Sequence, residues 1–221
     1  MFSQIILYNQ IRTTVQILGR GITLNKRRYD SETAKHEIRQ EASILFAQKG
    51  YNQTSVGDIS KASGYSKGHI YYHFENKEKL FVLLAQETMQ DWYNKWLQKE
   101  PTYLSATEKL YGMAMHVLYN YQTPLLKSGQ ELASNPSSSQ ESIQKLMELA
   151  ITPMSSYRSI LQEGVNNGEF TAGNVDEWTV LLGTWLGGLC QLTSSQELKS
   201  LEPLFNQAVT IFLGSIRKGG I

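Results

Sequence analysis

The stretch from Thr54 to Phe74 holds the residues whose types and spacing most clearly predict a chemical task. Ser55, followed three residues later by Asp58, predicts the start of a short helix. Gly64 predicts a tight turn after it, because glycine adopts the left-handed backbone conformation without a steric penalty. Ser66 then predicts the start of a second helix, which carries lysine, histidine and tyrosine side chains. Two short helices around such a turn are typical of a helix-turn-helix, whose second helix enters the DNA major groove.

The same pattern also fits an ordinary corner between two helices, because a fold motif does not establish function by itself. The residue identities favour the DNA-binding interpretation. The segments 46–51, 54–56, 58–59, 62–68, 70–74 and 76–81, which include Gly-Tyr-Ser-Lys-Gly and Ile-Tyr-Tyr-His-Phe, closely resemble the N-terminal module of the TetR/AcrR family of bacterial transcription regulators. The similarity is continuous from about Ile38 to Leu84. Further along, it is architectural, apart from residues 161–170.

The resemblance implies roles for individual side chains. It places Lys67, His69 and Tyr71 in the DNA groove, with Ser66 helping at the start of the helix, and it leaves Tyr65 to contact either bases or phosphates. His73 is expected either at a phosphate or packed inside the module. The residues expected at phosphates are Thr54, Ser55, Tyr72, His73 and Lys77.

The charge distribution agrees with an N-terminal half that meets phosphate. The first 80 residues carry twelve basic and seven acidic side chains (net +5), whereas the remainder carry nine and thirteen (net −4). The single cysteine, Cys190, excludes an internal disulfide and suits a reducing cytoplasm. No apolar run is long enough to predict a membrane span, and the N-terminus is a poor signal peptide. We therefore expect a cytoplasmic protein without a membrane partner.

The helical spacing of apolar residues, without useful strand-like alternation, predicts an all-α fold of about nine helices. We expect an N-terminal extension over residues 1–30, a three-helix DNA-binding domain over 31–76 and a helical effector-binding and dimerisation domain over 77–221. The first helix is expected from about Glu32 to Lys49. The extension has two open interpretations, which are a flexible segment and an amphipathic helix with a basic arm at Lys26-Arg27-Arg28.

Capping residues and prolines predict where the later helices begin and break. Ser105 with Glu108 predicts one start, and Ser138 with Glu141 predicts another. The helix from Ser138 is expected to continue to about Asn167 and to kink near Pro153, because proline removes a backbone hydrogen bond. Pro203 is expected in the first turn of the last helix.

The last two helices, at about 175–194 and 202–217, are the expected dimer interface. The first is apolar on nearly all sides, which one protomer alone would not cover. Gly183, Gly187 and Gly188 would allow close helix approach, and the family resemblance also implies a homodimer. The alternative is that both helices form the core of the C-terminal domain.

The C-terminal domain is rich in bulky and adaptable side chains, which suits a mostly apolar pocket for a small-molecule inducer, although helical cores have the same composition. No set of residues has metal-ligand spacing, and we expect no metal and no cofactor. Asn76 predicts the start of a helix at Lys77. This helix joins the two domains and would transmit ligand binding to the DNA. The candidate ligand-binding residues are Trp92, Met113, His116, Tyr119, Tyr157 and Trp185.

Together these features predict a sequence-specific transcriptional regulator, expected to be a repressor that binds double-stranded, near-palindromic operator DNA until a largely apolar ligand releases it. The sequence has no glycine-rich phosphate loop and no nucleophile elbow, so an enzyme is not expected. Two alternatives remain, which are a helical protein-interaction module without specific DNA binding and a regulator that acts without a ligand.

Overall fold

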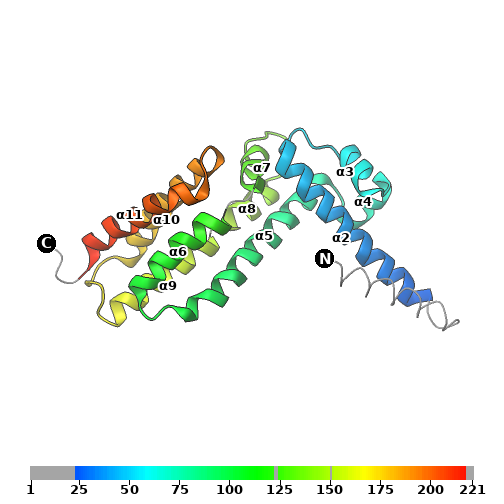
Figure 1. Cartoon of the computed structure of the whole chain (residues 1–221). Helices are drawn as coiled ribbons and strands as arrows, with labels where there is room; N and C mark the ends of the chain where they lie inside the picture. The colour runs from blue at the N-terminus through cyan, green and yellow to red at the C-terminus, as the bar shows by residue number, and fades with distance from the viewer. Residues whose placement is uncertain (1–22, 122–123, 150, 218–221) are drawn as a thin grey trace.

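The computed structural model describes residues 23–121, 124–149 and 151–217, and these form helices joined by short connections (Figure 1). The predicted all-α architecture is confirmed. Among the described residues, the β-type pairing is a single isolated bridge between Phe170 and Arg217. No described helix is both long and apolar enough to cross a membrane. The basic arm predicted at Lys26-Arg27-Arg28 falls within a helix, and residues 1–22 lie outside the described residues.

The N-terminal module consists of α2 (Thr23–Lys49), α3 (Val56–Ser63) and α4 (Lys67–Phe74). The predicted caps between them are confirmed. Ser55 and Asp58 form a full capping box, Gly64 ends α3 in the left-handed conformation (φ 76°), and Ser66 accepts a hydrogen bond from the backbone N–H of His69. The helix expected to begin near Glu32 begins instead at Thr23, so the first helix takes in part of the predicted extension.

The helix α5 (Lys77–Lys99) leads out of this module, and Asn76 caps it as predicted. It lies between the α2–α4 module on one side of the molecule and α10 and α11 on the other (Figure 1). The remaining elements, in chain order, are the short 3₁₀ helix η1 (Glu100–Thr102), α6 (Ala106–Asn120), α7 (Pro124–Ala133), α8 (Gln140–Leu149), α9 (Ile151–Asn166), α10 (Val175–Leu189), η2 (Cys190–Ser194) and α11 (Leu198–Ile216).

Two predicted helix boundaries in this half need correction. The described parts of the helix expected from Ser138 to about Asn167 are α8 and α9, on either side of residue 150, which lies outside the described residues, and Pro153 lies within α9. Ser139, rather than Ser138, receives the capping hydrogen bond, because the Ser138 hydroxyl donates to the Leu132 carbonyl. Pro203 lies inside α11, which begins at Leu198.

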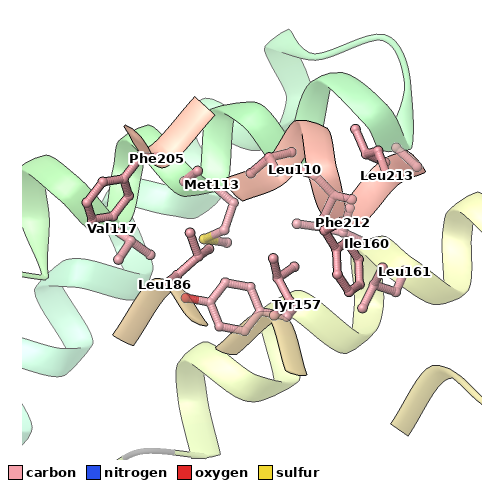
Figure 2. Packing of buried hydrophobic residues seen from close by; sticks show 14 of the residues in the cluster. Leu110, Met113, Val117, Tyr157, Ile160, Leu161, Leu186, Phe205, Phe212 and Leu213 are labelled. Carbon is pink, nitrogen blue, oxygen red and sulfur yellow. The ribbon is translucent and has the colours of Figure 1, made fainter. Parts of the chain in front are cut away.

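Two groups of buried side chains hold the fold together. The larger joins α5, α6, α9, α10 and α11, and Figure 2 shows Met113, Tyr157 and Leu186 facing one another within it. Gly183 lies against Met154 and Tyr157, so this glycine brings α10 close to α9 within the chain rather than to a partner. The smaller group fills the N-terminal module and includes Leu125 and Leu132 of α7. The N-terminal module therefore shares its core with a helix from the C-terminal half.

Candidate nucleic-acid interface and ligand cavity

The helix α4 presents one buried and one exposed face. Ile70 and Phe74 are buried, and they anchor the helix in the core of the module. The opposite side leaves four of the predicted DNA-contacting side chains exposed, at spacings that put hydrogen-bonding groups along the helix. These exposed residues are Lys67, His69, Tyr71 and Tyr72. This face can offer a cation, an imidazole and two phenol hydroxyls to a nucleic acid groove.

The two predicted serines lie at helix N-termini. Ser55 and Ser66 are exposed, and each side-chain oxygen accepts a backbone N–H from the first turn of its helix. The remaining N–H groups of these turns and the helix dipole favour an anion. Asp58 also binds Ser55 and carries a pKa below its usual value because of hydrogen bonds from Ser55. Its charge weakens the anion site at α3, so α4 has the better N-terminus for a phosphate.

Thr54 and Lys77, both expected at phosphates, are engaged inside the module. Thr54 is buried, and its hydroxyl donates to the Gly50 carbonyl at 2.7 Å. The Lys77 ammonium donates to the carbonyls of Tyr51 and Thr54 at 2.8 and 2.9 Å, and it lies 4.0 Å from the centre of the Tyr51 ring. Burial lowers the pKa of Lys77 and raises the pKa of Tyr51 to about 12. These side chains hold the loop that orients α3, and their predicted contacts with phosphates stay predictions.

The part-buried, hydrogen-bonded ammonium of Lys77 leads to a stability prediction. Lys77→Met keeps the aliphatic stem but leaves two carbonyls without their donor, so the free energy of unfolding should fall by about 2–4 kcal/mol. Chemical denaturation followed by circular dichroism would measure it. Lys79→Met is the matched control, because Lys79 is exposed and pairs with Glu75 at the surface, and it should change stability little. Equal stability of the two variants would contradict the structural role of Lys77.

His73 and Tyr65 contribute to the packing of the module. The centre of the His73 ring lies 4.7 Å from that of the His69 ring, and the His73 ring also packs beside Tyr72. Burial lowers the pKa of His73, and the charge of His69 lowers it further. The Tyr65 hydroxyl donates to Glu37 at 2.7 Å, which ties the turn before α4 to α2. For His73 the partly buried position agrees with the packed alternative. Both residues help to set the angle of α4.

A cavity of about 230 Å³ lies between α5, α7 and α8, with the end of α6 closing one side. Its wall is mostly aliphatic and aromatic, and none of the described lining residues carries a charged side chain. The lining residues are Phe81, Ala85, Thr88, Met89, Trp92, Asn120, Tyr121, Leu125, Leu126, Gly129, Gln130, Ala133, Ile143, Leu146, Met147 and Leu149.

Of the six residues predicted to contact a ligand, Trp92 lines this cavity. His116 lies behind it: the His116 Nε2 is 2.9 Å from the Trp92 carbonyl, and its Nδ1 is 3.2 Å from the amide nitrogen of Asn120. The other four do not line the cavity. Met113 and Tyr157 belong to the larger core, and Tyr119 and Trp185 are exposed.

The six candidate ligand-binding residues predicted from the sequence include none from α7 or α8. A signal was present, because Ile143, Leu146 and Met147 recur at helical spacing on one side of α8. That spacing predicts an apolar face but does not say what it faces. The cavity depends on packing between segments about 60 residues apart, such as Phe81 and Ile143.

The buried position of His116 leads to a pH prediction. Burial lowers the pKa of His116 below its usual value, so the folded state keeps the ring neutral. Below pH ~6.5 this histidine becomes protonated in the unfolded chain but stays neutral in the folded chain. The free energy of unfolding should therefore fall with decreasing pH until the lowered pKa of His116 is reached. His116→Gln should make the loss between pH 7 and 5 smaller than in wild type, as measured by denaturant unfolding at each pH. An unchanged slope would contradict a neutral buried His116.

Family models match nearly the whole described chain. The model described as bacterial regulatory proteins, tetR family, matches residues 38–84, and the model described as QacR-like protein, C-terminal region, matches residues 88–218. The HTH-type transcriptional regulator QacR of Staphylococcus aureus is 29% identical over 191 residues, which cover 83% of this chain and 98% of that protein.

Solved structures share the fold. One is a putative transcriptional regulator from Saccharomonospora viridis in complex with choline (TM-score 0.71, 19% identity, covering 85% of this chain and 99% of that one). Another is the transcriptional regulator FadR from Bacillus subtilis in complex with stearoyl-CoA (TM-score 0.64, 24% identity, covering 84% and 98%). Their ligands differ widely in charge and size, so the shared fold does not indicate which ligand this chain would bind.

Proposed function

Because this chain belongs to the TetR family of DNA-binding transcription regulators and carries a QacR-like C-terminal region, we propose that it is a repressor released from its operator by a small, largely apolar molecule. The observation that carries the DNA part is the exposed face of α4. Lys67, His69 and Tyr71 stand on the outer side of a helix whose inner side is anchored by Ile70 and Phe74. We place the protein in the cytoplasm, where its DNA is.

A homodimer would use the outer faces of α10 and α11. Leu181 and Trp185 of α10 and Ile211 of α11 are large apolar side chains that are 60%, 47% and 53% exposed. A Cβ added at Gly188 or Gly214 would meet nothing within 4 Å, so the surface beside them is open to a second helix pair. A two-fold axis through this face would present two α4 helices to successive major grooves about 34–36 Å apart.

Ligand binding would reach the DNA through two connections. The first is α5, which begins beside α4 and lines the cavity at Phe81 and Trp92. The second is α7, whose Ser128 hydroxyl donates to the Phe46 carbonyl at 2.8 Å and whose Glu131 accepts the backbone N–H of Asn52 at 3.0 Å. A ligand that widens the space between α5 and α7 would move α2 relative to α5. The two α4 helices of the dimer would then lose the spacing that the operator requires. The fraction of protein in this altered conformation depends on how much more tightly the ligand binds it than the DNA-binding conformation.

The direct test is binding of the purified protein to the intergenic DNA upstream of its own gene. We expect specific binding by a dimer in a gel-shift assay, with affinity that falls steeply as salt rises, because several phosphate contacts release counterions. Scrambled DNA of equal length is the control. Equal binding to both DNAs, or affinity independent of salt, would favour a protein-interaction role instead.

A further inference from the structure

Two histidines lie one helical turn apart on α4, the helix that the proposed function places at the DNA. The centres of the His69 and His73 rings are 4.7 Å apart. The two differ in exposure, because His69 is exposed on the outer face and His73 is partly buried beside Phe74. Histidine is the side chain whose charge ordinarily changes between pH 8 and 5. The pair therefore gives this face a charge that can depend on pH.

His73 is poorly placed to hold a proton. A charged imidazole carries two N–H donors, and the Nε2 of His73 is enclosed without a hydrogen-bond partner among the described residues. Protonating this ring would leave one donor unpaired and would put a second charge beside any charge on His69. Burial and the charge of His69 lower the pKa of His73, in agreement with this geometry. We expect His73 to stay largely neutral down to pH ~6.

His69 is in the opposite situation. Its ring lies beside that of Tyr65, with 5.2 Å between the ring centres, and the residue is exposed to solvent. A charge on an exposed ring costs little desolvation, and the negative field of DNA favours the charged form. The outer face of α4 therefore has one ring that can gain a charge beside DNA, and a neighbouring ring that resists it.

The charged groups of α2 that face the pair are engaged with other residues. Lys35 and Glu32 act in opposite directions on the charge of His73, and they form an ion pair with each other at 3.0 Å. Glu37 accepts the hydrogen bond of the Tyr65 hydroxyl at 2.7 Å. From this side, one cation and two carboxylates surround the histidines.

The charged groups of the other two neighbouring helices are also held in place. On α3, Asp58 lies 3.7 Å from the Lys49 ammonium. On α5, the Lys77 ammonium donates to two loop carbonyls, and Lys79 pairs with Glu75. Lysine and carboxylate side chains ordinarily keep their charge between pH 8 and 6, so the change of charge over this range falls to histidine.

We propose that α4 is a proton-sensitive reading element, in which His69 gains a positive charge between pH 8 and 6 and strengthens binding to DNA, while the enclosed His73 stays neutral. The inference rests on the proposed DNA-binding function and adds a way in which acidity would regulate it. Each half-site of the operator would take up one proton, because the second ring of the pair cannot share the charge. Acidification would therefore favour the DNA-bound state.

The test measures DNA affinity at two pH values across a salt series. Fluorescence anisotropy with a labelled upstream duplex should show about tenfold tighter binding by the full-length protein at pH 6 than at pH 8, at equal ionic strength. The slope of log affinity against log salt should become steeper by about two, which is about one for each half-site. Unchanged affinity and slope would overturn the proposal. A change in slope of about four would mean that His73 is charged as well, which would overturn its neutral role.

Three variants assign the charge to one ring. His69→Gln should remove both the gain in affinity and the change in slope. His73→Gln and His36→Gln should keep the ratio of affinities between pH 6 and 8, because His73 is neutral in the proposal and His36 is an exposed histidine on α2. A pH response that survives in His69→Gln, or that is lost in either of the others, would overturn the assignment. If His73→Gln does not fold, His69→Gln and His36→Gln decide.

The pH response and the regulator function fail separately. A scrambled duplex carries the same backbone charge, so the change in slope should appear on it as well. A protein that shows this response without preferring its upstream DNA would contradict the proposed function alone. Specific binding with equal affinity at both pH values would contradict this inference alone. Acid unfolding has the opposite sign, because loss of folded protein lowers the affinity at pH 6.

Discussion

Tyr71→Ala should weaken specific operator binding by at least about 30-fold while leaving the dimer and its stability intact. A good side-chain contact to a base edge contributes about 1–3 kcal/mol of discrimination, and a dimer loses it at both half-sites. Tyr71 is 47% exposed and outside the core, so removing its ring should change the free energy of unfolding little. Gel-shift titration at fixed salt, together with thermal unfolding, measures both quantities.

Lys67→Ala tests the same face through a charge. If Lys67 binds a base, specific binding should fall more than binding to scrambled DNA. If it binds a phosphate, both should fall, and the slope of affinity against salt should decrease by about two, which is about one for each half-site. Lys199→Ala is the matched control, because Lys199 is an exposed lysine on α11. Normal operator binding by both Lys67→Ala and Tyr71→Ala would exclude this face of α4 as the reading surface.

The double variant Leu181→Asp with Ile211→Asp should convert the protein to monomers. If α10 and α11 form the interface, a two-fold axis buries four unpaired carboxylates there, and even about 3 kcal/mol of that cost raises the dimer dissociation constant more than about 100-fold. Sedimentation velocity would show the change in mass. Operator binding should fall with it, since a monomer engages one half-site.

The control for that variant uses a more exposed leucine outside α10 and α11. Leu104 is 91% exposed and lies two residues before the start of α6. Leu104→Asp should leave both the mass and the operator affinity unchanged. If the double variant stays dimeric and binds DNA as wild type does, the interface lies on another surface.

Features that depend on neighbouring residues in the chain could be predicted from the sequence. The capping box of Ser55, the left-handed turn at Gly64 and the caps at Ser66 and Asn76 all agree with expectation. Each depends on a hydrogen bond or a backbone angle within one helical turn, so residue type and spacing are sufficient. The family resemblance, carried by the same segment, added the DNA-binding function.

Where side chains point was decided by contacts between distant segments. Thr54 and Lys77 are polar and beside a helix terminus, yet the 50–54 loop and α5 enclose them and take their hydrogen bonds. Likewise, α7 and α8 form the cavity and pack on the DNA-reading module, so Trp92, which belongs to the larger core, also lines the cavity, whereas Met113 and Tyr157 do not. Helical periodicity shows that a face is apolar. Only the tertiary structure shows whether it meets protein, a cavity or solvent, because that choice depends on residues far apart in the chain.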